Sequence, residues 1–215
     1  MEIIWYGHSF FRLKDRGISI VTDPYDESTG YPPVKVKADV VTISHYAPGH
    51  SNLKAVRGKP IVFDGPGEYE VKGVFITGVP SWHRKKKGSR PERTTIFIFE
   101  FDSITVAHLG DMGEVPSQEE VEELPAVDVL LVPVGGKDTL DASKAAEVVS
   151  MLEPKVVIPM HYKTEFTRLS LDGVEKFLKQ MGKKDVEPLP SFKVKSRRDL
   201  PDETQVVLLK CNVAS

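Results

Sequence analysis

Residues 38–51, ADVVTISHYAPGHS, connect an apolar run to a loop that carries two histidines, His45 and His50. The run is rich in β-branched residues and is followed by Pro48 and Gly49, which predicts a buried strand that ends in a loop. A histidine at the end of a strand is a common structural residue as well as a common metal ligand. The interpretation therefore depends on whether other ligand side chains converge on this loop.

Four more histidines lie at or just after the ends of apolar, strand-like runs. They are His8 after EIIWYG, His83 after VFITGVPSW, His108 at the end of SITVAH, and His161 after VVIPM. Strand ends at one edge of a sheet share a rim, so loops there can bring together residues that are distant in sequence. Imidazoles beside a carboxylate such as Asp111 suit zinc, or manganese or iron. The alternatives are backbone-bonded histidines, for His8 and His108 in particular, and turn residues at Asp23 and Asp111.

Composition limits the protein classes that fit the chain. Its 215 residues suggest one domain, residues 1–215, and a formal net charge of -2 argues against a general nucleic-acid-binding protein. The lone cysteine, Cys211, cannot form an internal disulfide. The sequence shows no signal peptide and no apolar run of membrane-spanning length, so we expect a cytoplasmic protein that does not enter a membrane. A homo-oligomer remains open.

Strands dominate the first two-thirds of the chain, and helices come late. We expect a hairpin turned at Asp102-Ser103, strands over 128–134, 155–160 and 205–210, and helices over 117–124, 141–152 and 171–181. The first hundred residues lack crossovers of helical length, which disfavours a doubly wound fold. Two sheets sandwiched between outer helices are the expected α+β architecture.

Seven segments resemble, in order and over nearly the whole chain, the metallo-β-lactamase-fold hydrolases. They are WYGHSFFRL, TDPYDESTGYP, VTISHYAPGHSN, GVPSWH, HLGDMGEV, DVLLVPVGG and VVIPMHYKT. Within that family the chain is most similar to hydrolases related to ascorbate-6-phosphate lactonase and, more distantly, to N-acylphosphatidylethanolamine phospholipase D. The resemblance implies a four-layer αββα sandwich with a site for two metal ions along one edge of the sheets.

The family signature, His-x-His-x-Asp-His, aligns with residues 45–50. His45 and His50 match its first and last positions, whereas Ala47 and Gly49 replace the inner His and Asp. The resemblance assigns the remaining metal ligands to His83, Asp111 and His161, with Asp111 shared between ions. It implies one or two Zn²⁺ ions, or Mn²⁺ or Fe²⁺, with occupancy weakened by the two missing ligands, and a single ion or a rearrangement in which His8 or a water fills the gap is the alternative.

The resulting expectation is hydrolysis of an ester, lactone or phosphodiester bond in a small anionic substrate by metal-bound hydroxide, with Asp111 and His161 as catalytic residues. Asp23 is expected to support a ligand histidine, and His8 and His108 to lie near the site. Lys163 and the basic run 84–90 are candidates for contacting the anion, although such a run is often only a solvated loop. The rivals are a non-catalytic binding or scaffold protein that lost tight metal binding through Ala47 and Gly49, and a less favoured RNA-processing nuclease.

Overall fold

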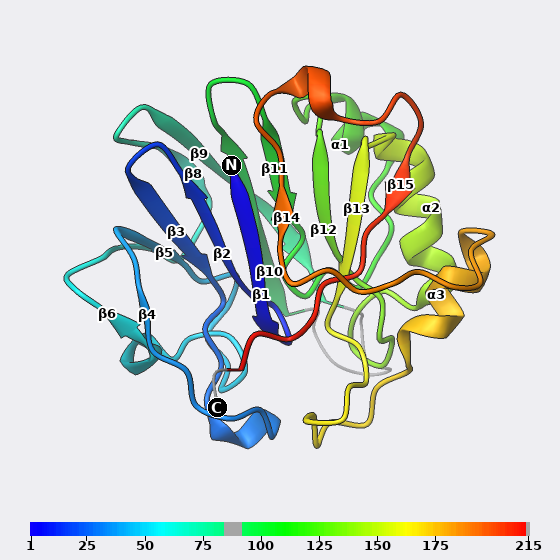
Figure 1. Ribbon diagram of the computed structural model, residues 1–215, viewed down its shortest axis with the longest axis horizontal. Helices are drawn as coiled ribbons and strands as arrows, with labels where there is room; N and C mark the ends of the chain where they lie inside the picture. The colour runs from blue at the N-terminus through cyan, green and yellow to red at the C-terminus, as the bar shows by residue number, and fades with distance from the viewer. Residues whose placement is uncertain (84–91, 214–215) are drawn as a thin grey trace.

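Two mixed β-sheets face each other in the computed structural model, which describes residues 1–83 and 92–213 (Figure 1). The six-stranded sheet has the order β14-β1-β2-β3-β5-β7. Its strands are β1 (Glu2–Gly7), β2 (Phe10–Asp15), β3 (Ile18–Thr22), β5 (Val40–Thr42), β7 (Ile61–Phe63) and β14 (Phe192–Lys193). The two-sheet arrangement confirms the α+β sandwich.

The seven-stranded sheet has the order β15-β13-β12-β11-β10-β9-β8. Its strands are β8 (Gly67–Val71), β9 (Val74–Trp82), β10 (Arg93–Glu100), β11 (Thr105–His108), β12 (Val129–Pro133), β13 (Val156–Met160) and β15 (Gln205–Val206). Strands β12 and β13 are buried at every residue, as their continuous apolar runs predict. Antiparallel pairing of β10 with β11 confirms the hairpin at Asp102-Ser103.

Alternating side chains divide the six-stranded sheet between two apolar cores. Leu13 and Ile20 enter the main core between the sheets, where they join residues such as Phe97. Phe10 and Val21 point to the opposite face and pack in a second core. The segments on either side of β5 cover this second core. They contain β4 (Val36–Lys37), β6 (Val56–Arg57) and two short 3-10 helices, Glu27–Thr29 and Leu53–Ala55.

Within the described residues, three α-helices lie beside the seven-stranded sheet (Figure 1). They are α1 (Gln118–Glu122), α2 (Ala142–Leu152) and α3 (Val174–Gln180), and α2 packs against α1, α3 and β12. The expected capping box of Ser117 and Glu120 opens α1. None of the helices in the described part of the chain has the length and apolar character needed to cross a bilayer.

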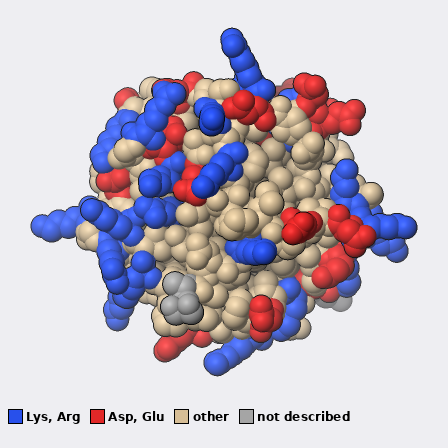
Figure 2. Space-filling view, viewed as in Figure 1, with Lys and Arg blue, Asp and Glu red and all other residues tan. Residues whose placement is uncertain are grey.

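Figure 2 shows both signs of charge on the viewed face.

The final strand is shorter than the apolar run 205–210 predicts. Only Gln205 and Val206 pair with β13, after which Leu209 forms an isolated bridge with Leu189. The backbone N–H of Lys210 donates to the carbonyl of Leu189 at 2.8 Å. The chain leaves the sheet there because its backbone groups find partners in the segment that precedes β14.

Strand direction brings the loops of both sheets to one edge. Strands β1, β3, β5 and β7 run the same way, because β2 is antiparallel to both β1 and β3 and β3 is parallel to β5. In the other sheet β9, β11, β12 and β13 share one direction for the same reason. The segments that follow these strands include the histidines at positions 8, 45, 50, 83 and 161.

Asp141 provides a test of how α2 is held beside the sheet. Its carboxylate caps the helix by accepting from the backbone N–H groups of Ser143 and Lys144, at 3.1 and 3.0 Å. We expect Asp141→Ala to cost about 1 kcal/mol of unfolding free energy and to lower Tm by roughly 2–4 °C. Glu147→Ala, on the exposed side of the same helix, is the matched control and should melt with the wild type. An unchanged Tm for Asp141→Ala in thermal denaturation followed by circular dichroism would contradict the capping role.

Candidate metal centre

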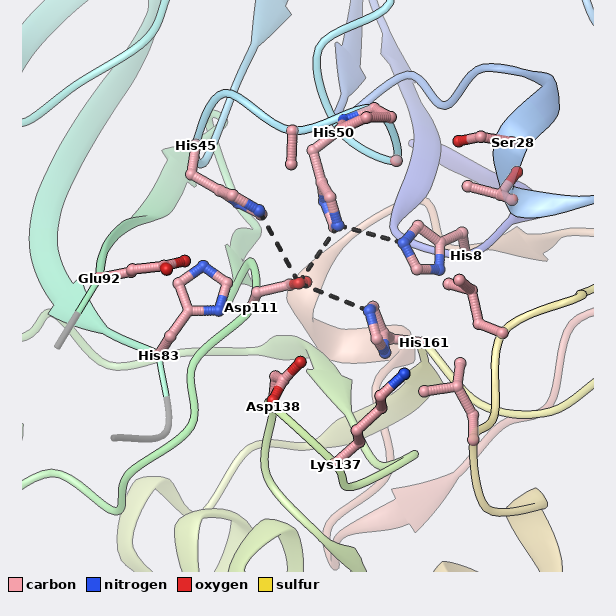
Figure 3. Close-up of a pocket in the computed structure, with 16 residues that line it drawn as sticks. His8, Ser28, His45, His50, His83, Glu92, Asp111, Lys137, Asp138 and His161 are labelled. Carbon is pink, nitrogen blue, oxygen red and sulfur yellow. Dashed lines mark hydrogen bonds and ion pairs between the residues drawn. The ribbon is translucent and has the colours of Figure 1, made fainter. Parts of the chain in front are cut away.

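A cavity of about 340 Å³ opens where the strand ends of the two sheets meet (Figure 3). Its lining residues come from loops after β1, β3, β5, β9, β11, β12 and β13. They include His8, His45, His50, His83, Asp111 and His161. The structure therefore brings together all five of the predicted metal ligands, and His8, which was expected near the site, lines the same cavity.

Two groups of three side chains have the spacing of metal ligands. One contains His45, His83 and Asp111, and the other contains His8, His50 and His161. Within each group the candidate ligand atoms lie within 4.8 Å of one another. The first group matches one of the two sites that the sequence implies, whereas the second places His8 beside the two expected histidines.

Asp111 lies between the two groups, and its carboxylate faces imidazoles from both (Figure 3). Its Oδ2 is 3.2 Å from Nε2 of His50, 3.5 Å from Nε2 of His161 and 4.0 Å from Nε2 of His45. The Asp111 side chain is only 8% exposed. A carboxylate in this position can contact an ion held by either group, as the shared role predicted for Asp111 requires.

Asp23 orients two of the candidate ligands, His50 directly and His45 through Ser44. Its Oδ2 lies 3.0 Å from Nδ1 of His50, so the expected contact with a candidate ligand is present. Asp23 also accepts from the backbone N–H and the hydroxyl of Ser44, at 2.7 and 2.6 Å. The same hydroxyl is 3.0 Å from Nδ1 of His45. A carboxylate on one ring nitrogen fixes the tautomer and leaves the other nitrogen to face a metal.

The protonation states of the candidate ligands differ across the centre. Burial lowers the pKa of His45 to about 4 and holds the pKa of His8 well below its ordinary value. Burial alone would lower the pKa of His50 as well, but the charges and hydrogen bonds of Asp111 and Asp23 together outweigh it and raise this pKa to about 10. Burial would raise the pKa of Asp111, yet His161 and His50 outweigh it and hold that pKa well below its usual range. An ionised carboxylate and neutral imidazoles are the forms that bind metal, so Asp111, His8 and His45 are in a binding form, whereas His50 would have to give up its proton to a metal ion.

Several buried polar atoms around the cavity have no hydrogen-bond partner within the described residues. Among them are Nε2 of His83, Oδ1 of Asp111, and Nδ1 of His8 and of His161. An unsatisfied buried group costs about 1–3 kcal/mol. Of these atoms, Nε2 of His83 and Oδ1 of Asp111 belong to one group of candidate ligands, and imidazole nitrogen and carboxylate oxygen are common ligands of a divalent cation.

The backbone around the cavity is strained. His8, Asp23 and His161 all adopt positive φ angles, of 52°, 39° and 52°. This left-handed conformation is uncommon for residues other than glycine and costs about 1–3 kcal/mol when the surroundings impose it. Gly135 permits the fold of the loop after β13, because a Cβ at Gly135 would lie 2.1 Å from the carbonyl oxygen of His161.

Two residues expected near the site do not line the cavity. His108 lies behind it, with Nε2 3.0 Å from the carbonyl oxygen of Ser9, which is the backbone-bonded alternative. Lys163 donates from Nζ to the carbonyl of Thr167 at 2.8 Å, so the structure does not bring it to the candidate ligands. The basic run 84–90 lies outside the described residues.

Sequence reasoning missed other residues of the cavity wall. Ser28, Glu92, Lys137, Asp138, Leu169 and Leu171 all line it. Lys137 follows Gly135-Gly136 and has a positive φ of 64°, so the glycine pair was the available signal that this loop turns sharply beside the site. The others lie in loops whose position depends on tertiary packing.

Comparisons with known proteins agree with this geometry. The family model described as "Beta-lactamase superfamily domain" matches residues 2–161. A UPF0173 protein of Pyrococcus furiosus is 30% identical over 222 residues, covering 90% of this chain and 100% of that protein. A UPF0173 metal-dependent hydrolase of Pyrococcus abyssi is 30% identical over 215 residues, covering 86% of this chain and 93% of that one.

A solved structure shows the same similarity in three dimensions. The crystal structure of a metallo-β-lactamase superfamily protein from Thermotoga maritima superposes with a TM-score of 0.78 at 40% identity, covering 97% of each chain. The chain therefore belongs to the UPF0173 family of metal-dependent hydrolases within the metallo-β-lactamase superfamily.

Proposed function

We propose that this protein hydrolyses an ester, lactone or phosphodiester bond in a small anionic substrate, using one or two divalent metal ions with Zn²⁺ as the first candidate. The observation that carries the proposal is the carboxylate of Asp111, buried between two groups of imidazoles. His45 and His83 would hold one ion with Asp111, and His50 and His161 would hold the other. We include a lactone among the candidate bonds because the sequence resembles hydrolases related to ascorbate-6-phosphate lactonase.

A bound divalent ion would supply a water of lowered pKa and would polarise the scissile carbonyl or phosphoryl oxygen. The protein's own groups position the reaction. Asp111 is the shared acceptor between the two groups, and Asp23 fixes the orientation of His50 through Nδ1. His161 lies beside Asp111 on the opposite wall from His45 (Figure 3). A substrate in the cavity would therefore contact ligands from both sheets at once.

Charge in the cavity favours an anionic substrate. Two divalent ions would outweigh the buried carboxylates of Asp23 and Asp111, so the loaded centre would carry net positive charge. Lys137 lines the same cavity and lies near His161 (Figure 3). A phosphate or carboxylate group of the substrate could pair with the Lys137 ammonium while the reacting bond faces Asp111.

The central test is metal removal and reconstitution. Chelated protein should lose turnover of p-nitrophenyl phosphodiester, aryl ester and lactone probes, and added ZnCl₂ should restore it for at least one bond class. Asp111→Asn should lower that turnover by about 100-fold or more, because it removes the shared ligand charge. Asp102→Asn, in the exposed turn between β10 and β11, is the matched control. Protein that binds less than about 0.2 equivalents of zinc, manganese or iron would instead support a non-catalytic role for the loop containing Ala47 and Gly49.

Asp23 provides a separate test of how the ligands are oriented. Asp23→Asn keeps the side-chain shape but removes the charge that holds Nδ1 of His50, so we expect zinc affinity to fall about 10- to 100-fold. Isothermal titration of chelated protein with ZnCl₂ measures this change. Asp39→Asn is the control, because Asp39 accepts from a backbone N–H of the same sheet, that of Ser19, away from the cavity. Equal affinities for wild type and Asp23→Asn would argue against the supporting role.

Lys137 tests the charge of the substrate. Lys137→Ala should raise KM roughly tenfold for an anionic probe and leave KM for a neutral ester unchanged, because a charge-assisted contact is lost only with the anion. Steady-state kinetics with the two probes separate these effects. Lys179→Ala, exposed on α3, is the matched lysine control. A similar rise in KM for both probes would contradict a charge-specific contact.

A further inference from the structure

His8 occupies space that a side chain at position 49 would otherwise fill. A Cβ built on Gly49 would lie 2.8 Å from Nε2 of His8 and 3.2 Å from its Cδ2. Contacts below 3.0 Å are essentially never adopted by real Cβ atoms. The imidazole in its present position and any side chain at position 49 therefore exclude each other. Gly49 is the residue that leaves room for the ring.

The His8 ring lies where a metal ligand would be needed. Its Nε2 is 3.1 Å from Nε2 of His50, and the ring centroids of His8 and His161 are 4.1 Å apart. Two nitrogens at Zn–N distances of about 2.0–2.1 Å in a tetrahedral shell are roughly 3.3 Å apart. The spacing between His8 and His50 is close to that value. Nδ1 of His8 is buried and has no hydrogen-bond partner among the described residues.

The backbone holds His8 in this orientation. Its φ of 52° places it in the left-handed region, a conformation that is costly for a histidine. Two donors fix its carbonyl oxygen, the indole N–H of Trp5 at 3.0 Å and the backbone N–H of His161 at 3.2 Å. The second of these bonds ties the loop after β1 to the loop after β13. His8 and His161 therefore keep their places relative to each other across the two sheets.

We propose that His8 is the third protein ligand of the metal ion bound by His50 and His161, and that Gly49 is the residue that admits it. This inference rests on the proposed metal-dependent function. In the signature that the sequence resembles, position 49 carries an aspartate, so an imidazole supplied from the end of β1 replaces a carboxylate of the loop. The exchange leaves the centre one unit more positive than a centre with that carboxylate, which favours an anionic ligand.

Moving the ligand from position 8 to position 49 tests the assignment in the full-length protein. Chelated protein is titrated with ZnCl₂, and bound zinc is counted by elemental analysis after dialysis. We expect two ions in the wild type, and a loss of affinity for one of them of about 100-fold or more in His8→Ala. Gly49→Asp alone should lower the affinity for the same ion by at least about tenfold, because the new side chain collides with the His8 ring. The double variant His8→Ala/Gly49→Asp should bind two ions, with affinities within about tenfold of the wild type.

Two further measurements separate ligation from structural damage. Cobalt absorption spectra should change in His8→Ala, because the number of imidazoles around the ion falls, whereas a purely structural role would leave the spectrum of the bound ion unchanged. Gly65→Asp introduces the same side chain at a glycine whose Cβ would meet no atom within 4 Å, and it should bind zinc as the wild type does. Gly49→Ala displaces the His8 ring without altering residue 8 itself. It should also lower the affinity of the protein for one of the ions.

The outcomes distinguish this inference from the proposed function. Wild-type protein that binds no metal overturns both. If the wild type binds metal and His8→Ala binds the same number of ions with the same affinities and cobalt spectrum, only the assignment of His8 is overturned. Gly49→Asp that binds zinc more tightly while His8 is present would also overturn it. A single ion in the wild type that is lost in His8→Ala still supports the assignment.

Discussion

The buried negative charge of Asp111 is the constraint on which the rest of the centre depends. A carboxylate that is only 8% exposed is too costly to keep ionised unless positive charge or hydrogen-bond donors lie beside it. A proton on His50 serves this purpose, and the raised pKa of His50 follows from Asp111 together with Asp23. A divalent cation could replace that proton. The imidazoles of His50, His161 and His45 lie close enough to Asp111 for either arrangement.

The convergence of these groups follows from strand direction rather than from the length of any one element. Parallel pairing of β3 with β5, and of β11 with β12 and β13, sends their following loops to one edge. The left-handed backbone at His8 and His161 then turns each side chain back towards the cavity. That strain costs stability locally, and the two apolar cores supply the packing that maintains it. The sandwich is thus a rigid frame for loops that would not hold these conformations alone.

The sequence predicted the elements whose patterns are local, and it predicted the candidate ligands by their place after strands. The buried runs of β12 and β13, the capping box at Ser117 and the hairpin at Asp102-Ser103 all depend on neighbouring residues. The early end of β15 depends instead on backbone partners near Leu189, which no local pattern reveals. The same limit applied to the site. His108 and His8 both lie at strand ends, and only tertiary packing turns one towards a backbone carbonyl and the other into the cavity.

Gly49 shows why a gap in a sequence motif does not establish the loss of a site. A sequence motif describes the ligands of one loop. Metal binding depends instead on which ligand atoms surround the ion, whichever strand or loop supplies them. Removing a side chain at position 49 creates space, and the ring that fills this space comes from a residue more than forty positions earlier in the chain. Ala47 differs in this respect, because it lines the cavity without offering a ligand atom. The two missing signature residues are therefore not equivalent: the group that contains His8 still offers three imidazoles, and the group of His45 and His83 depends more strongly on its shared carboxylate, Asp111.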